Sequence, residues 1–191
     1  MNTTKQGMRL ALLLALVAVN AASCRNPAQK QHSRDAANDK NDIKFKDKTD
    51  ERTASLLVDA VAADDQVILL SGLAAQQTTR SDVKDIAIRM KNVHTALLDR
   101  FKAYAVKRNI SVPAEETKQA REEYVALAAL PPQQFDKKWC ELLLQKHRKM
   151  ITDFETALNS QPEEDIKKLL QEVLPPLREQ NDKLMQYHHR L

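Results

Sequence analysis

Apolar residues recur along most of the chain at alternating spacings of three and four, the pattern of helices that each bury one face. Between residues 52 and 77 the apolar stripe comprises Leu56, Ala60, Ala63, Val67, Leu70 and Ala74. Between residues 82 and 108 it comprises Val83, Ala87, Met90, His94, Leu97, Phe101 and Tyr104. The sequence therefore predicts two long helices joined by a short turn, and the second carries a histidine on its apolar face.

The second half of the chain repeats this pattern. Residues 114–128 predict a shorter helix, and two prolines at 131 and 132 follow it. Residues 133–158 predict another long helix, whose apolar face also includes a histidine. The members of that face are Trp139, Leu143, His147, Met150, Phe154 and Leu158.

A last helix is predicted to begin just after Ser160, which forms a capping-box pattern with Glu163. Ile166, Leu169, Leu170, Val173 and Leu177 face inward in this helix. Pro175 and Pro176 lie between Val173 and Leu177 in the same stretch. Because proline removes a backbone donor and clashes with the preceding turn, we expect these two residues to kink the helix or split it.

These elements predict an all-α fold with four long helices, each about 38 Å long at 1.5 Å per residue. About 25 residues, including the short helix, separate the second long helix from the third. Such a connection is long enough to cross the bundle and make those two helices parallel. The predicted fold is therefore a ferritin-like four-helix bundle with a long helical crossover and a Pro-kinked last helix. An up-and-down array of five helices is the alternative.

The N-terminal residues 1–23 have the organisation of a lipoprotein signal peptide. Lys5 and Arg9 precede an uninterrupted apolar run, LALLLALVAV, at 10–19. This run is shorter than the roughly 20 apolar residues that a membrane span requires, but it suits the core of a signal peptide. Small residues then lead to Cys24, an order that resembles a bacterial lipobox. We expect acylation of Cys24, palmitate included; an ordinary cleaved signal with an incidental cysteine is the alternative.

Residues 24–50 contain few large apolar side chains and are predicted to be a disordered tether, leaving 51–191 as the helical-bundle domain. The chain has 30 basic and 26 acidic residues, a net charge of +4, and residues 1–50 carry all of it. The neutral body gives no support for a nucleic-acid partner. With only two glycines in the chain, a Rossmann or P-loop enzyme is also disfavoured.

His94 and His147 are the candidates for metal ligands, because both lie on apolar helix faces. Di-iron bundles place a glutamate three residues before each histidine, where this chain has Lys91 and Leu144. Asp64 is the single carboxylate expected to point inward. The alternatives are a weak, open site for a metal such as zinc, and two core histidines bonded to backbone, to each other or to Tyr104. We expect the second, with no metal and no cofactor.

The sequence contains no recognisable set of catalytic residues. No pattern pairs a nucleophile with a base, and Cys140 lies beside Trp139 in an apolar helix, where a thiol is inert. Because His94 and His147 are also expected to be core residues without a metal, the sequence predicts a protein that is not an enzyme.

From about residue 54 to 184 the chain resembles the family called domain of unknown function 4142. The matching segments are LLSGLAAQQ (69–77), DVKDIAIRM (82–90), NISVP (109–113), FDKKW (135–139), FETAL (154–158) and LPPLREQ (174–180), with both core histidines. The resemblance implies an extracytoplasmic helical bundle and no established activity. The family pattern has an acidic residue where Val67 stands, and aspartates where Val93 and Lys146 precede the histidines. Only His94 and His147 therefore carry over as metal candidates.

The sequence thus predicts a non-enzymatic lipoprotein of the bacterial cell envelope, anchored through Cys24 to the outer membrane and facing the periplasm. Arg25, rather than aspartate, follows the cysteine and favours the outer membrane. Its partners would be the membrane and an envelope protein or the cell wall. The alternative is a ferritin-like metal-binding or redox protein that uses His94 and His147.

Overall fold

The computed structural model describes residues 34–160 and 162–190, and every regular element within them is a helix. The long helices are α3 (Lys48–Gln77), α4 (Ser81–Lys107), α6 (Pro132–Asn159) and α7 (Glu164–His188). Two shorter helices are α2 (Arg34–Lys44) and α5 (Lys118–Ala128). The predicted all-α fold is confirmed. None of the helices described is both long and apolar enough to cross a membrane.

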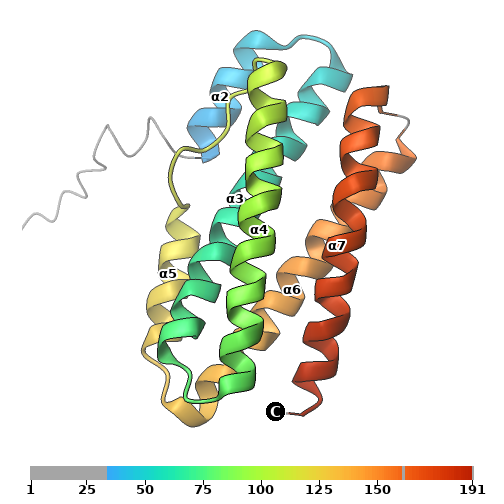
Figure 1. Cartoon of the computed structure of the whole chain (residues 1–191). Helices are drawn as coiled ribbons and strands as arrows, with labels where there is room; N and C mark the ends of the chain where they lie inside the picture. The colour runs from blue at the N-terminus through green and yellow to red at the C-terminus, as the bar shows by residue number, and fades with distance from the viewer. Residues whose placement is uncertain (1–33, 161, 191) are drawn as a thin grey trace, which may run out of the picture.

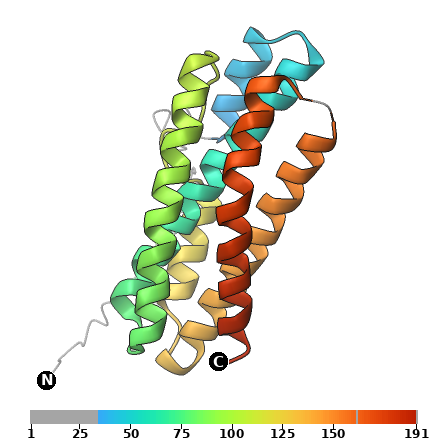
Figure 2. The same cartoon turned by 45° about the vertical axis from the view of Figure 1, so that its right-hand side comes forward.

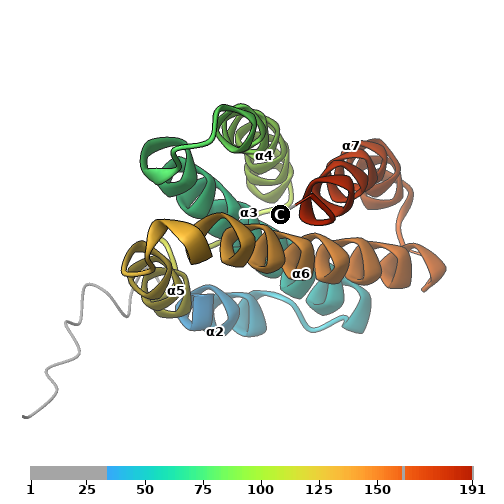
Figure 3. The ribbon, with the colours of Figure 1, turned by 90° about the horizontal axis from the view of Figure 1, so that it is seen from below.

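The four long helices form a bundle, and the predicted crossover is present. In Figures 1 and 2, α3 and α4 run in opposite directions, the chain then passes through α5, and α6 runs parallel to α4 before α7 returns. Viewed along the bundle, α2 and α5 lie outside α3 and α6, on the side away from α4 and α7 (Figure 3). The crossover helix begins later than predicted, because the hydroxyl of Thr117 accepts a hydrogen bond from Ala120 N at 3.1 Å and caps it there.

The prediction of a disordered tether is wrong for residues 34–50. Helix α2 and the first turn of α3 occupy this segment, while residues 24–33, which complete the predicted tether, lie outside the described residues. The side chain of Asp47 accepts hydrogen bonds from Thr49 N and Asp50 N, and so begins α3. Local caps and contacts with the rest of the fold stabilise a segment that composition alone assigned to disorder.

Helix α2 is held by the connector that follows α4. The amide of Asn41 donates to Ser111 O and accepts from Ser111 N, both at 2.8 Å, so two complementary bonds join segments 70 residues apart. Lys44 Nζ donates to Asn109 O and to Ser111 Oγ, both at 2.9 Å. Asn109 has φ of 55°, a left-handed conformation that asparagine tolerates, and it turns the chain back toward α2.

Two predictions concern the last helix. Of the kink or split expected at Pro175 and Pro176, the split does not occur, because α7 is one continuous element that includes both prolines. Both prolines lie on the outer side of α7, where water can satisfy the carbonyl groups that lose their backbone donors. The predicted capping box is also absent: Ser160 ends α6, and its hydroxyl donates to Ala157 O at 2.7 Å, while α7 begins after Glu163.

Two apolar clusters fill the interior of the bundle. One lies where α3 begins and α4 and α6 end, and its buried residues include Leu57, Phe101, Phe154, Leu170 and Leu177. The other lies where α3 ends and α4 and α6 begin, and its buried residues include Leu70, Met90, Trp139, Leu184 and Tyr187. The division between these clusters contains the polar residues described next.

Candidate functional site

Four of the buried polar side chains lie between the two apolar clusters, one from each long helix. They are Asp64 on α3, His94 on α4, His147 on α6 and Gln180 on α7. The first three are 0% exposed, and Gln180 is 5% exposed. We call these four residues the polar layer.

Helical spacing places the polar layer between the two clusters. On α3, Asp64 stands three residues after Val61 of the first cluster and three before Val67 of the second. On α7, Gln180 stands three residues after Leu177 and four before Leu184 in the same way. His94 and His147 occupy the equivalent positions on α4 and α6. Each polar side chain is therefore held on the inner face of its helix by the apolar turns above and below it.

Three hydrogen bonds form a chain through Asp64, His94 and His147, three of the four residues of the polar layer. Asp64 Oδ1 lies 2.7 Å from His94 Nδ1, and His94 Nε2 lies 3.0 Å from His147 Nε2. The other ring nitrogen of His147, Nδ1, lies 2.8 Å from Leu143 O. The two imidazole rings meet edge to face, with centroids 4.9 Å apart and an interplanar angle of 82°.

The backbone carbonyl at the end of this chain fixes the direction of the bond between the two histidines, and for neutral rings it also fixes the proton on Asp64. Leu143 O can only accept, so His147 Nδ1 carries a hydrogen. A neutral His147 then has a lone pair on Nε2, and His94 must donate to it from its own Nε2. A neutral His94 in turn has a lone pair on Nδ1, so the carboxyl of Asp64 must donate. The geometry is satisfied by a neutral chain in which Asp64 is protonated.

Burial favours this uncharged arrangement. Desolvation lowers the pKa of His94 to about 4 and that of His147 to about 3, the latter also because His94 is nearby. Desolvation likewise raises the pKa of Asp64 well above its usual value. Asp64 Oδ2 is buried and has no hydrogen-bond partner among the described residues. A neutral carboxyl places an unpaired carbonyl oxygen there instead of part of a negative charge, which is the less costly state.

The polar layer has some features of a metal site and lacks others. Histidines that bind metals usually donate from the second ring nitrogen to a carboxylate or carbonyl, and here each Nδ1 has such a partner while the Nε2 atoms face each other. Within the described residues, however, no group of three or more His, Cys, Asp or Glu is placed to hold a metal. Asp64 Oδ1 is already bonded to His94. The fourfold coordination that zinc prefers is not provided by these side chains.

The structure thus brings His94, His147 and Asp64 together, as the inward positions of all three predicted. Tyr104, weighed above as a partner for the histidines, instead donates to Asp165 Oδ1 at 3.0 Å. The thiol of Cys140 is buried and donates to Leu184 O at 3.4 Å, and burial raises its pKa to about 12. Cys24 lies outside the described residues.

Gln180 and Leu143 O were not identified from the sequence. Gln180 could have been found, because it continues the stripe of Val173 and Leu177 toward Leu184 at spacings of three and four. The carbonyl of Leu143 carries no sequence signal, since every residue has one.

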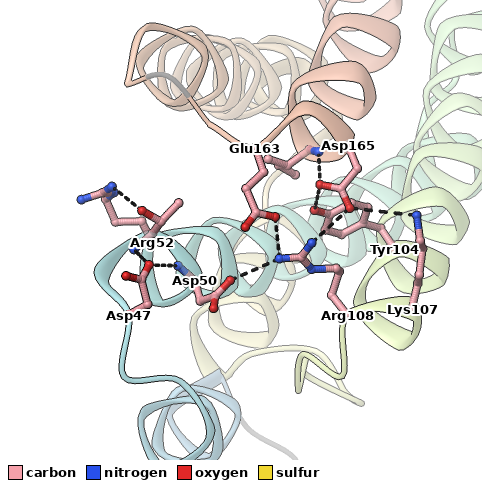
Figure 4. A network of polar contacts seen from close by, with 10 residues as sticks. Asp47, Asp50, Arg52, Tyr104, Lys107, Arg108, Glu163 and Asp165 are labelled. Atoms are coloured by element: carbon pink, nitrogen blue, oxygen red, sulfur yellow. Dashed lines mark hydrogen bonds and ion pairs between the residues drawn. The ribbon is translucent and has the colours of Figure 1, made fainter.

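A second polar cluster, also missed, joins three helix ends at one end of the bundle (Figure 4). Arg108, just after α4, pairs with Glu163 at 2.6 Å, with Asp50 at 3.2 Å and with Asp165 at 3.3 Å. Partial burial alone would raise the pKa of Asp165, but the hydrogen bond from Tyr104 and the charge of Arg108 hold it below its usual value. The charged side chains of this cluster remain partly exposed, and we assign the cluster to holding α3, α4 and α7 together.

Comparison with known proteins gives a family and a fold. The family model described as "Domain of unknown function (DUF4142)" matches residues 35–186. This match begins within α2, which agrees with the observation that α2 is part of the folded domain. No curated protein matches the chain.

Among solved structures, the crystal structure of a DUF305 fragment from Deinococcus radiodurans is similar, with a TM-score of 0.65 at 14% identity. The similarity covers 73% of this chain and 97% of that one. At this identity the likeness shows a shared helical fold alone.

Proposed function

This chain belongs to the family of domain of unknown function 4142, and on that premise we propose that it is a bacterial envelope lipoprotein whose bundle acts by contact rather than catalysis. The observation that carries the non-catalytic part is the closed polar layer. Its histidines and Asp64 bond to one another and to backbone, and none of the three is exposed. A substrate would reach them only if the bundle opened.

The anchor is the second part of the proposal. Cys24 follows a basic start and an apolar run of ten residues, the order in which a lipoprotein is processed and acylated. Each buried CH₂ contributes about 0.8 kcal/mol to membrane affinity, so two or more acyl chains anchor a protein stably where one does not. The anchor would hold the bundle at the outer membrane, facing the periplasm, where an envelope protein or the cell wall is within reach.

Replacing the acylated cysteine tests the anchor. Cys24→Ser should release the protein from membranes and abolish labelling by a fatty-acid probe in intact cells. Cys140→Ala is the matched control, because that thiol is buried in the bundle and should not affect either result. Unchanged membrane fractionation of Cys24→Ser would contradict the proposal.

A ferritin-like metal-binding or redox function of His94 and His147 is the second candidate. The observation in its favour is that each Nδ1 already has a carboxyl or carbonyl partner while the two Nε2 atoms face each other. Metal analysis of protein purified from the envelope separates the two candidates. Stoichiometric metal that is lost in the variant His94→Ala with His147→Ala, and retained in His189→Ala, would establish the second candidate in place of the first.

A further inference from the structure

An open groove lies between the C-terminal half of α5 and the first turns of α6. It has a volume of about 560 Å³, within the range of roughly 300–1,000 Å³ typical of small-molecule pockets. Ala126, Leu127 and Leu130 form one wall, and Leu142 forms the other. We call it the α5–α6 groove. It arises because α5 has 11 residues and covers only part of α6, which has 28.

Three of the four charged side chains that line the α5–α6 groove, all but Lys137, are already paired. Glu123, at one end, pairs with Lys146 at 2.7 Å and accepts a hydrogen bond from Gln66 at 2.8 Å. Lys138, on the α6 side, pairs with Glu141 at 3.8 Å. The aliphatic stems of the lysines add apolar surface while their ammonium groups remain in water. A ligand in this groove would therefore gain from apolar contact and need no charge of its own.

The first described residue lines a cavity that shares one residue with the α5–α6 groove. Arg34 pairs with Asp59, and both line a second cavity between α3 and α6. Glu123 lines this cavity as well as the α5–α6 groove, so the two hollows adjoin. Figures 1 and 3 show α2 and α5 on the same side of the molecule. Nine residues lie between Cys24 and Arg34, and the ten residue-to-residue steps that connect them reach at most about 35 Å.

From the groove's apolar walls and the position of Arg34, we propose that the α5–α6 groove holds one acyl chain attached to Cys24 of the same molecule. This inference rests on the proposed lipid anchor, which supplies the acyl chain. Its consequence is that the protein shelters one chain from water when it is not in a membrane. Each CH₂ moved from water into the groove contributes about 0.8 kcal/mol, so a long acyl chain gains enough to stay bound.

Titration with palmitate tests the groove itself. The full-length Cys24→Ser protein, which has no chain of its own, should bind palmitate at one site by calorimetry. Ala126→Phe in that background should weaken binding at least tenfold, because the new ring fills the groove from an exposed position without removing a core contact. Ala103→Phe, at an exposed site on α4, is the matched control and should change binding less than twofold. Absence of palmitate binding to a folded Cys24→Ser protein would overturn the proposal.

The acylated wild-type protein tests whether its own acyl chain occupies the α5–α6 groove. If its acyl chain fills the α5–α6 groove, acylated wild-type protein taken out of detergent should bind added palmitate at least tenfold more weakly than Cys24→Ser. Equal binding by the two proteins would show that the groove is empty in the acylated form and would overturn the proposal. Mass spectrometry of Cys24 is read separately: a missing acyl chain refutes the anchor, and with it the occupant, even where the groove binds palmitate.

Discussion

At the scale of single residues, the carbonyl of Leu143 determines which atoms of the polar layer carry protons. The resulting direction requires Asp64 to donate to His94 Nδ1. An asparagine amide can also donate at this position, whereas leucine cannot. We therefore expect Asp64→Asn to change the free energy of unfolding near pH 6 by less than about 1 kcal/mol. Asp64→Leu, which leaves a buried nitrogen unpaired, should cost about 1–3 kcal/mol.

Chemical denaturation of the two variants measures this difference, and nitrogen NMR of the wild type locates the protons directly. His94 should show hydrogen on Nε2 and a bare Nδ1, and His147 the reverse. A doubly protonated His94 at neutral pH, together with a large loss of stability in Asp64→Asn, would show an ion pair with Asp64 and contradict the neutral arrangement.

The same groups predict how stability depends on pH. The pKa values of His94 and His147, about 4 and 3, lie below the 6.5 expected for an unfolded histidine. The unfolded chain therefore binds more protons below pH 6.5, and the free energy of unfolding should fall with falling pH, by up to about 1.4 kcal/mol per pH unit for each histidine. Asp64 acts in the opposite sense, because its raised pKa makes stability fall as pH rises through the folded-state value.

We therefore expect the free energy of unfolding to pass through a maximum, with an acid arm set by the histidines and an alkaline arm set by Asp64. Denaturant unfolding from pH 4 to 8 measures this profile. Asp64→Asn should remove the loss on the alkaline side and leave the acid side in place. His189→Gln, at the exposed end of α7, is the control and should leave both arms unchanged. A flat profile in the wild type would show that these groups keep ordinary pKa values in the folded state.

The sequence predicts which of these polar residues are buried, but not which atoms they form hydrogen bonds with. The spacing of apolar residues places His94, His147 and Asp64 on inner faces, and the structure confirms this. Which ring nitrogen meets which acceptor depends on the rotation and translation of three helices relative to one another. The spacing along any one helix contains no information on that quantity.

At the scale of whole elements, α2 shows where composition misleads. Its sequence is so polar that only Ala37 and Asn41 are buried, too few to give an apolar stripe. The helix is held instead by polar contacts with the connector after α4. Such contacts depend on tertiary structure and cannot be read from the sequence of α2. The predicted capping box is absent for the same reason. The sequence at Ser160 fits the start of a helix, but in the fold Ser160 ends α6.

Asn41 is the residue on which the attachment of α2 depends. Asn41→Ala removes both bonds to Ser111 and leaves a partly buried backbone N–H and C=O unpaired, so we expect a loss of about 1–3 kcal/mol in the contact of α2 with the domain. Hydrogen exchange should increase in 34–44 while α3 remains protected. Asp39→Ala, at an exposed position of the same helix, is the control. Equal protection of α2 in the two variants would contradict this account.

At the scale of the whole molecule, the polar layer divides the core into two apolar clusters, and its side-chain hydrogen bonds join α3, α4 and α6. Breaking it at one point leaves buried groups without partners. His147→Leu deprives the Nε2–H of His94 of its acceptor, and His94→Leu deprives both Asp64 and His147. Each single substitution is therefore expected to cost about 2–5 kcal/mol.

Replacing the three bonded residues together should behave differently. In the variant Asp64→Leu, His94→Leu, His147→Leu all three members of the hydrogen-bonded chain are gone, so none is left without its partner, and Gln180 is the one residue of the polar layer that remains between the two clusters. Because buried polar networks are often no more stable than well-packed apolar residues, we expect this triple variant to unfold within about 1 kcal/mol of the wild type or at higher denaturant. The three single costs should then greatly exceed the triple cost, which denaturant unfolding of all four variants measures. If the triple cost instead equals the sum of the single costs, the three residues act independently, and the polar layer does not join the helices as one unit.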